Sequence, residues 1–232
     1  MNDYILTAEN INKKYGKNTI LSDVSMNVKK GEIYGLIGKN GSGKTTLFRI
    51  ITGLIKEYKG NVFVNASRVS AVINYPALFL DMSAVQNMKL QANLLGMNDD
   101  NEIKQILNAV GLSNCGNKAV KKFSLGMTQR LKLGMALLEN PEILILDEPA
   151  NGLDPDGIFE LRELLLNLNR SKGITILISS HVLNELEQII TYVGILHGGG
   201  IVKELSVNDI RRGGEKLEDI YIQYTRGVSS FV

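Results

Sequence analysis

One stretch of eight residues limits the possible folds more than any other part of this chain. Residues 38–45 read Gly-Lys-Asn-Gly-Ser-Gly-Lys-Thr, which fits the spacing G-x-x-x-x-G-K-S/T. The apolar run Ile33–Ile37 precedes it, and the helix-like run Thr46–Ile51 follows. In that context the backbone N–H groups of the glycine turn and the positive end of the helix both point at phosphate oxygens. The stretch therefore predicts a phosphate loop, and the flanking runs disfavour the alternative of a plain glycine turn.

The residues of this loop have separate expected roles. Lys44 would bring a positive charge to the β- and γ-phosphates of a nucleotide, and the Thr45 hydroxyl would bind Mg²⁺. The other loop residues expected to contact the nucleotide are Gly38, Asn40, Gly41, Ser42, Gly43 and Thr46.

Strand-like and helix-like runs alternate along the rest of the chain. Antiparallel strands are expected over 4–11 and 20–28, with a turn at 13–18 between them. Further expected elements are strands at 60–64, 69–73, 143–146 and 174–178, helices at 155–172 and 182–190, a hairpin over 193–202, and two short helices over 206–224. Between these lies a helical segment, 83–140, with apolar residues at helical spacing. We therefore predict one α/β domain over 1–232, with its core and β-subdomain in 1–82 and 141–232 and a helical insertion at 83–140.

Composition excludes several other classes of protein. A net charge of +2 indicates neither a nucleic-acid-binding surface nor an acidic partner, so no nucleic acid is expected. The single cysteine, Cys115, excludes an internal disulfide. The N-terminus lacks a signal-peptide pattern, and no apolar run approaches the length of a membrane span. We expect a cytoplasmic chain that would act at a membrane only through a partner.

Polar side chains follow two of the predicted buried strands. Asp147 and Glu148 come directly after the strand 143–146, and His181 comes directly after the strand at 174–178 and two serines. Because ligands bind at the carboxyl ends of parallel strands, we expect both segments to lie beside the phosphate loop. Asp147 would hold Mg²⁺ through water, and Glu148 would activate the attacking water. The alternatives are an exposed acidic pair and a structural histidine at strand ends.

Five motifs in this order resemble those of the ATP-binding subunits of ABC transporters. Besides the loop and the acidic strand end, they are the signature-like Phe123–Met127, the D-loop-like Asn151–Asp154 and the segment Ser179–His181. The resemblance covers nearly the whole chain and implies a P-loop NTPase (RecA-like) core with an N-terminal antiparallel β-subdomain and an α-helical signature subdomain. It also implies that Tyr15 stacks on adenine and that His181 donates to the γ-phosphate.

The resemblance further implies an ATP-dependent head-to-tail homodimer. Each ATP would then lie between the phosphate loop of one copy and the signature segment of the other, with Ser124, Gly126 and Asp154 at the interface. By sequence alone, Ser124 and Asp154 are N-caps of the helices that follow them. Both roles are compatible, because a cap can share its helix end with a phosphate.

The chain departs from the family pattern at three positions. Asn74 stands where the family has a glutamine that contacts Mg²⁺ and the attacking water, and its shorter side chain predicts a water-mediated metal contact. Leu125 and Met127 replace a glycine and a glutamine of the signature, while Ser124 and Gly126 are retained. This shortened set is similar to that of bacterial transporters that export or resist peptide antibiotics such as bacitracin and lantibiotics.

We therefore expect a Mg²⁺-dependent ATPase subunit that binds ATP and powers a separate integral membrane permease, located at the inner face of the cell membrane through that permease. The helical insertion would contact the permease. One alternative is a non-transport ABC ATPase acting on ribosomes or DNA, which the chain length and the lack of heptads disfavour. A second is a nucleotide-gated dimerisation module with negligible hydrolysis, which Glu148 disfavours.

Overall fold

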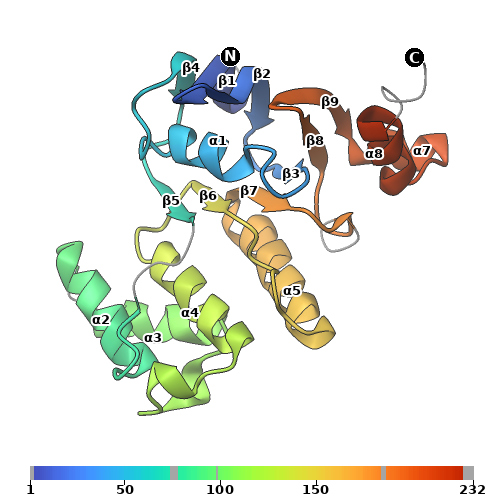
Figure 1. The fold of residues 1–232 in the computed structure, drawn as a ribbon. Coiled ribbons are helices and arrows are strands. Elements are labelled where there is room, and N and C mark those ends of the chain that lie inside the picture. The colour runs from blue at the N-terminus through green and yellow to red at the C-terminus, as the bar shows by residue number, and fades with distance from the viewer. Residues whose placement is uncertain (1–2, 74–77, 98, 184–186, 227–232) are drawn as a thin grey trace.

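The computed structural model describes residues 3–73, 78–97, 99–183 and 187–226. Two sheets lie above a group of helices (Figure 1). A three-stranded antiparallel sheet has the order β2-β1-β4, and a six-stranded sheet has the order β5-β6-β7-β3-β8-β9. The strands are β1 (Tyr4–Tyr15), β2 (Asn18–Lys29), β3 (Ile33–Ile37), β4 (Lys59–Val64), β5 (Val69–Val72), β6 (Ile143–Leu146), β7 (Thr175–Ser180), β8 (Tyr192–His197) and β9 (Gly200–Ser206). All neighbours in the larger sheet are parallel except the hairpin β8-β9.

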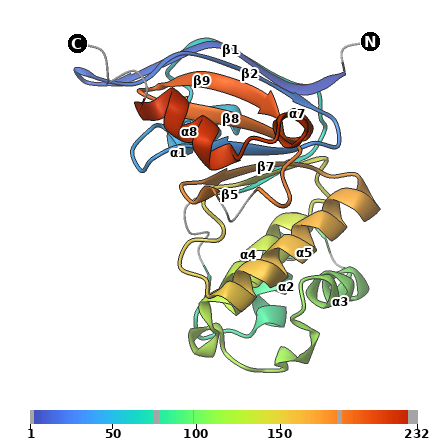
Figure 2. The ribbon, with the colours of Figure 1, turned by 90° about the vertical axis from the view of Figure 1, so that its right-hand side faces the viewer.

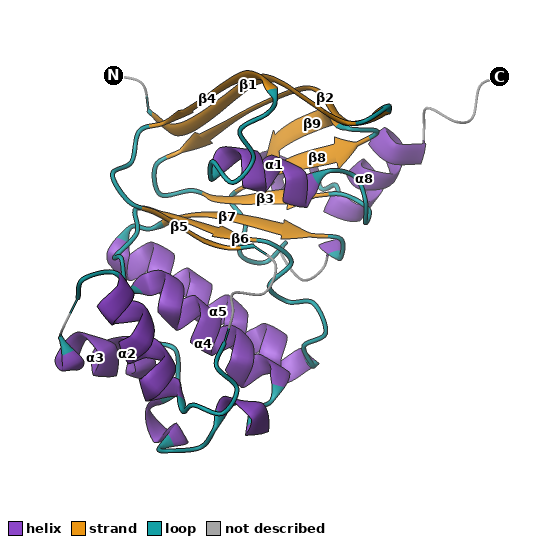
Figure 3. Cartoon of the chain, turned by 60° about the vertical axis from the view of Figure 1, so that its left-hand side comes forward, coloured by secondary structure: helices purple, strands orange, loops and turns teal. Residues whose placement is uncertain are grey.

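Helices cover both faces of the larger sheet. Helix α1 (Lys44–Ile51) lies between the two sheets, and α5 (Pro155–Lys172) lies on the opposite face (Figure 3). Alternate residues of β6 face opposite sides of the sheet: Ile143 and Ile145 pack with the first sheet and α1, whereas Leu144 and Leu146 pack with α5 and the helical segment. This period-two alternation of fully apolar residues is why the strand reads as a continuous apolar run.

The predicted helical insertion forms a separate group of helices below the larger sheet (Figure 2). It contains α2 (Ala84–Leu94), α3 (Asp100–Ala109) and α4 (Leu125–Leu137). A side chain caps the start of each helix. Ser83 forms a capping box with Gln86 at α2, whereas Asp99 caps α3 and Ser124 caps α4. The insertion is thus confirmed as helical, while its limits at residues 83 and 140 stay predictions.

The C-terminal part matches the sequence pattern. The hairpin β8-β9 is followed by two short helices, α7 (Val207–Gly213) and α8 (Leu217–Arg226), as predicted. The expected helix over 182–190 overlaps residues 184–186, which lie outside the described ranges. Across the described part of the chain, no helix has the length and apolar character that a membrane-spanning segment requires.

The predicted turn is present at Gly16 and Lys17, but its predicted bounds, 13–18, are too wide. Strand β1 continues to Tyr15, which pairs with Asn18 at the start of β2, so the loop holds only Gly16 and Lys17. Gly16 takes a positive φ of 57°, which glycine adopts without strain. Lysine and asparagine have low strand propensity, but pairing with the neighbouring strand overrides that preference here.

A partly buried polar pair joins two strands of the larger sheet. The hydroxyl of the fully buried Tyr34 on β3 donates a 2.6 Å hydrogen bond to Glu204 Oε1 on β9. Burial raises the pKa of the Glu204 carboxyl, while the bond from Tyr34 opposes that shift. The folded-state pKa lies above the unfolded one, so this group stabilises the fold at acidic pH and the contribution is lost as pH rises through the folded pKa.

We therefore predict that Glu204→Gln removes this pH dependence. Glutamine keeps an acceptor oxygen for Tyr34 but does not ionise. The free energy of unfolding is measured by denaturant titration at several pH values. The difference between the variant and wild type should shift in favour of the variant as pH increases from the range near the ordinary glutamate pKa to neutral pH. Tyr34→Phe, which removes the opposing hydrogen bond, should make the pH dependence steeper. If the difference in the free energy of unfolding between Glu204→Gln and wild type stays constant with pH, then Glu204 does not titrate with a raised pKa in the folded protein.

Candidate functional site

Three segments meet at one edge of the larger sheet, as the sequence predicts. The phosphate loop follows β3, Asp147 follows β6, and His181 follows β7, which lies between β6 and β3. The backbone N–H of Gly38 donates to the carbonyl of Ser180, which ties the start of the loop to the end of β7. Parallel strands end at the same edge, so residues far apart in sequence become neighbours there.

The phosphate loop is shaped by its glycines. Gly41 and Gly43 have φ values of 80° and 112°, a region that other residues rarely adopt. A Cβ on Gly38 would lie 2.6 Å from Ser42 Oγ and 2.5 Å from the carbonyl oxygen of Leu196. Gly43 is also the N-cap of α1 and supplies no side-chain oxygen, so the first N–H groups of that helix keep no cap partner. These groups can bind a phosphate.

An unsatisfied hydroxyl lies inside the same loop. Ser42 Oγ is buried without a hydrogen-bond partner, which among the described residues is otherwise true only of Arg130 Nε. Buried polar side-chain atoms are normally paired, so an orphan in a glycine loop suits an anionic ligand. This observation supports the phosphate-loop interpretation independently of the motif.

Lys44 holds the loop together in this structure. Its Nζ donates to the carbonyl oxygens of Gly38, at 2.6 Å, and Lys39, at 3.2 Å. It also forms a 3.0 Å ion pair with Glu148 Oε1, and its side chain is only 5% exposed. Three oxygens thus position a buried cation at the place where the sequence predicts the terminal phosphates.

Asp147 is held by two hydroxyls. Thr45 Oγ1 donates to its Oδ2, and Ser179 Oγ donates to its Oδ1, both at 2.7 Å. Ser179 Oγ also accepts a 2.9 Å bond from the backbone N–H of Glu148. The sequence singled out Thr45 and Asp147 but missed Ser179, because its role depends on β7 lying beside β6. The sequence feature that could have identified Ser179 is its position at the end of a buried apolar strand, where ligand-binding side chains gather.

Glu148 occupies an unusual backbone conformation. Its φ of 51° is in the left-handed region, where a glutamate carries a steric cost. One carboxylate oxygen pairs with Lys44, and the other hydrogen-bonds with His181 Nδ1. The predicted base and the predicted switch histidine are therefore in direct contact.

The oxygen atoms around Thr45 fit Mg²⁺. A hydroxyl and a carboxylate from two elements face the same cleft, whose volume is about 260 Å³. The cleft is lined by Asn40, Thr45, Val72, Leu125, Gln129, Lys132, Asp147, Glu148 and Asn151. In the described ranges no group of three or more His, Cys, Asp or Glu residues could hold a metal alone. Mg²⁺ commonly binds through one or two carboxylates together with substrate phosphates, so Thr45 and Asp147 are the residues that could hold it here.

The signature-like and D-loop-like segments lie together around a second cleft of about 350 Å³. Ser124 caps α4 by accepting from the Met127 N–H at 3.2 Å, and Asp154 caps α5 by accepting from the Gly157 N–H at 2.8 Å. Both predicted N-caps are confirmed. Gly126 lines the same cleft, so Ser124, Gly126 and Asp154 form one surface beside the phosphate-loop cleft of the same chain.

Two further residues are predicted from the sequence to contact the ligand, Tyr15 and Asn74. Tyr15 is 48% exposed at the end of β1, and Lys13 Nζ lies 4.9 Å from the centre of its ring. Asn74 lies outside the described residues, so its water-mediated metal contact stays a prediction.

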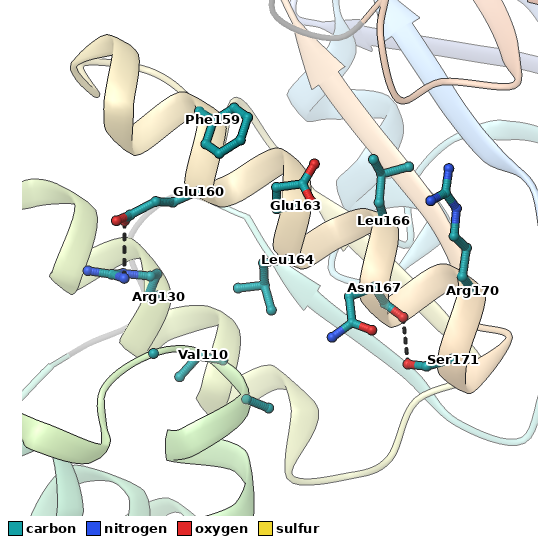
Figure 4. A pocket seen from close by; sticks show the side chains of 12 residues that line it. Val110, Arg130, Phe159, Glu160, Glu163, Leu164, Leu166, Asn167, Arg170 and Ser171 are labelled. Atoms are coloured by element: carbon teal, nitrogen blue, oxygen red, sulfur yellow. Dashed lines mark hydrogen bonds and ion pairs between the residues drawn. The ribbon is translucent and has the colours of Figure 1, made fainter.

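A larger hollow of about 730 Å³ separates α5 from the helical insertion. Figure 4 shows that Glu160 and Leu164 on α5 point toward Arg130 and Val110 across the hollow. Arg130 on α4 forms a 3.1 Å ion pair with Glu160 on α5. The Arg130–Glu160 ion pair therefore connects the helical insertion to α5 at the side of this hollow.

A family model described as "ABC transporter" matches residues 21–151, more than half of the chain. The chain belongs to the ABC transporter family. It is 41% identical to "Lantibiotic transport ATP-binding protein SrtF" of Streptococcus pyogenes over 94% of this chain and 96% of that protein. It is 40% identical to "Bacitracin transport ATP-binding protein BcrA" of Bacillus licheniformis over 91% of this chain and 73% of that protein.

Solved structures agree with this assignment. The ADP conformation of MJ1267, an ATP-binding cassette of an ABC transporter, superimposes with a TM-score of 0.82 at 26% identity, covering 94% of this chain and 98% of that one. The predicted P-loop NTPase fold is thereby confirmed. The chain is an ATP-binding ABC ATPase subunit, and such subunits power transport together with membrane permeases. The non-transport alternative finds no support among these relatives.

Proposed function

We propose that this ABC subunit hydrolyses Mg²⁺-bound ATP as a head-to-tail homodimer and powers a permease that exports, or gives resistance to, a peptide antibiotic. The observation that carries the catalytic part is that Lys44 and His181 both contact Glu148, the residue next to Asp147. The names of SrtF and BcrA support the substrate class. On this proposal the subunit lies at the inner face of the membrane, bound to the permease.

Each residue of the site has a separate role in the proposed hydrolysis of ATP. Lys44 exchanges its loop carbonyls and Glu148 for the β- and γ-phosphate oxygens, so nucleotide binding frees the Glu148 carboxylate. Glu148 then accepts a proton from the attacking water, and His181 holds its second oxygen in place. A bound Mg²⁺, held by Thr45 and, through water, by Asp147, would neutralise negative charge on the phosphates.

In the dimer, the second surface would complete the partner's site. Ser124, Gly126 and Asp154 lie together at the starts of α4 and α5, where the positive helix ends favour a phosphate. Tyr15 is exposed at the end of β1, and on this proposal it would stack on adenine.

The test is a tolerance assay. The chain is expressed in an antibiotic-sensitive bacterium together with the membrane protein of the neighbouring reading frame, and growth is measured against bacitracin and a lantibiotic. We expect tolerance with the wild-type chain and none with Glu148→Gln at equal expression. Equal tolerance with both chains would contradict an ATP-driven role, and no tolerance to either compound would contradict the substrate class.

A further inference from the structure

Glu148 lies in a short segment whose backbone is held by the core. Its φ of 51° is in the left-handed region, which a glutamate keeps only where the surrounding structure enforces it. The Glu148 N–H donates to Ser179 Oγ at 2.9 Å, and the Asn151 N–H donates to the Glu148 carbonyl at 3.2 Å, which closes a turn. These two bonds fix the backbone of Glu148 on either side of its side chain.

A further bond holds the next residue, Pro149, from a different part of the chain. Gln129 on α4 donates from Nε2 to the carbonyl oxygen of Pro149 at 3.1 Å. Pro149 is buried, and because proline has no N–H, this carbonyl is its one polar backbone group. Since α4 lies in the helical insertion and Pro149 follows β6, the bond joins two parts of the fold directly beside Glu148.

The surroundings of this bond leave little room for water. A recess of about 10 Å³ lies beside it, and apart from Gln129 and Pro149 it is lined by the apolar side chains of Val72, Leu133, Leu146 and Leu161. That volume is at the lower limit for one water molecule. Without the Gln129 amide, the Pro149 carbonyl would lose its partner in an apolar environment, and a shift of the segment would relieve both that cost and the strain at Glu148.

We propose that Gln129 is a positioning residue for ATP hydrolysis, which acts by holding the Glu148 segment in its strained conformation. In that conformation the Glu148 carboxylate lies between Lys44 and His181, and each of them contacts one of its oxygens. A displacement of about 1 Å in a reacting group can lower a rate by about 10²-fold. The inference rests on the proposed function, in which Glu148 is the general base.

Two substitutions at Gln129 test the bond to Pro149. Gln129→Met keeps the length of the side chain and removes the donor, whereas Gln129→Lys keeps a donor. At saturating ATP we expect Gln129→Met to lower the single-turnover rate of hydrolysis roughly 5–30-fold, and Gln129→Lys to stay within about threefold of wild type. The affinity of Gln129→Met for ATP, measured by calorimetry, should stay within about twofold of wild type. Gln129 also lines the phosphate-loop cleft, so a large loss of ATP affinity would indicate a direct contact with the nucleotide and would overturn the proposal.

A double-mutant cycle with Glu148→Gln shows whether Gln129 acts through the base. In the Glu148→Gln background, Gln129→Met should change the residual rate by less than about twofold, because no base is left to position. Rate losses that multiply would overturn the proposal, and so would a wild-type rate for Gln129→Met alone. A wild-type rate for Glu148→Gln alone would instead contradict the proposed function, since Glu148 would then not be the base.

Glu160→Gln is the matched control. It removes the ion pair between Arg130 on α4 and Glu160 on α5, which also connects the helical insertion to the core, but it leaves the bond to Pro149 in place. Its rate of hydrolysis should stay within about twofold of wild type. A loss as large as that of Gln129→Met would mean that the general attachment of α4, and not the bond to Pro149, supports hydrolysis. Thermal unfolding checks that each variant is folded, and if Gln129→Met is not, Gln129→Ala removes the donor in its place.

Discussion

Glu148→Gln is expected to lower the rate of ATP hydrolysis by roughly 10²–10⁴ while ATP affinity is retained, because a general base typically contributes that much. Glutamine has nearly the same shape and keeps an oxygen for Lys44, so the loop geometry should survive. The measurements are steady-state phosphate release and equilibrium ATP binding. In the proposed dimer, the variant should also form a stable ATP-bound dimer, detectable by size-exclusion chromatography with light scattering.

A control separates this effect from a general loss of negative charge. Glu163→Gln removes an exposed carboxylate on α5, away from the cleft, and should leave turnover within about twofold of wild type. Turnover of Glu148→Gln close to that of wild type would show that another group activates the water. Loss of ATP affinity in Glu148→Gln would show that the carboxylate holds the loop rather than acting in the chemical step.

The local parts of the site could be predicted from the sequence. The phosphate loop is defined by residues adjacent in the chain, and its glycines are required by backbone conformation, as the φ values of Gly41 and Gly43 show. Asp147 and Glu148 follow a continuous apolar run, which marks a buried parallel strand. Ser124 and Asp154 are themselves the N-cap residues of the helices that follow them, as their residue types predict. Each of these features depends on spacing within one short segment.

Features that depend on strand order or on packing between segments could not be predicted. Ser179 orients Asp147 because β7 lies between β6 and β3, and the sequence does not fix that order. Lys132 interrupts an apolar helix, and only the arrangement of α4 against the core shows that it lines the cleft. The sequence predicts a turn that includes Tyr15, whereas pairing with β2 extends β1 through that residue.

In the proposed mechanism, the contacts of Lys44 link nucleotide binding to the start of the reaction. In this structure the Lys44 ammonium pairs with one carboxylate oxygen of Glu148, and His181 contacts the other. A base whose two oxygens are both occupied is poorly placed to take a proton from water. Phosphate oxygens compete for Lys44, so the arrival of ATP would free the base at the point where it is needed. In this proposal, Lys44 couples the binding of ATP to the activation of Glu148 as the general base.

Lys44→Ala should therefore weaken ATP binding as well as hydrolysis, by roughly 10²-fold or more in affinity, because it removes a charge-assisted contact that exists before the transition state. It also leaves Glu148 without its cation and two loop carbonyls without their donor. Lys39→Ala is the matched control: this exposed lysine of the same loop contributes its backbone carbonyl, and alanine keeps that group. Calorimetric titration with ATP should show near-normal affinity for Lys39→Ala and a large loss for Lys44→Ala. Similar affinities for both variants would mean that the backbone of the loop, and not the Lys44 ammonium, provides most of the binding energy.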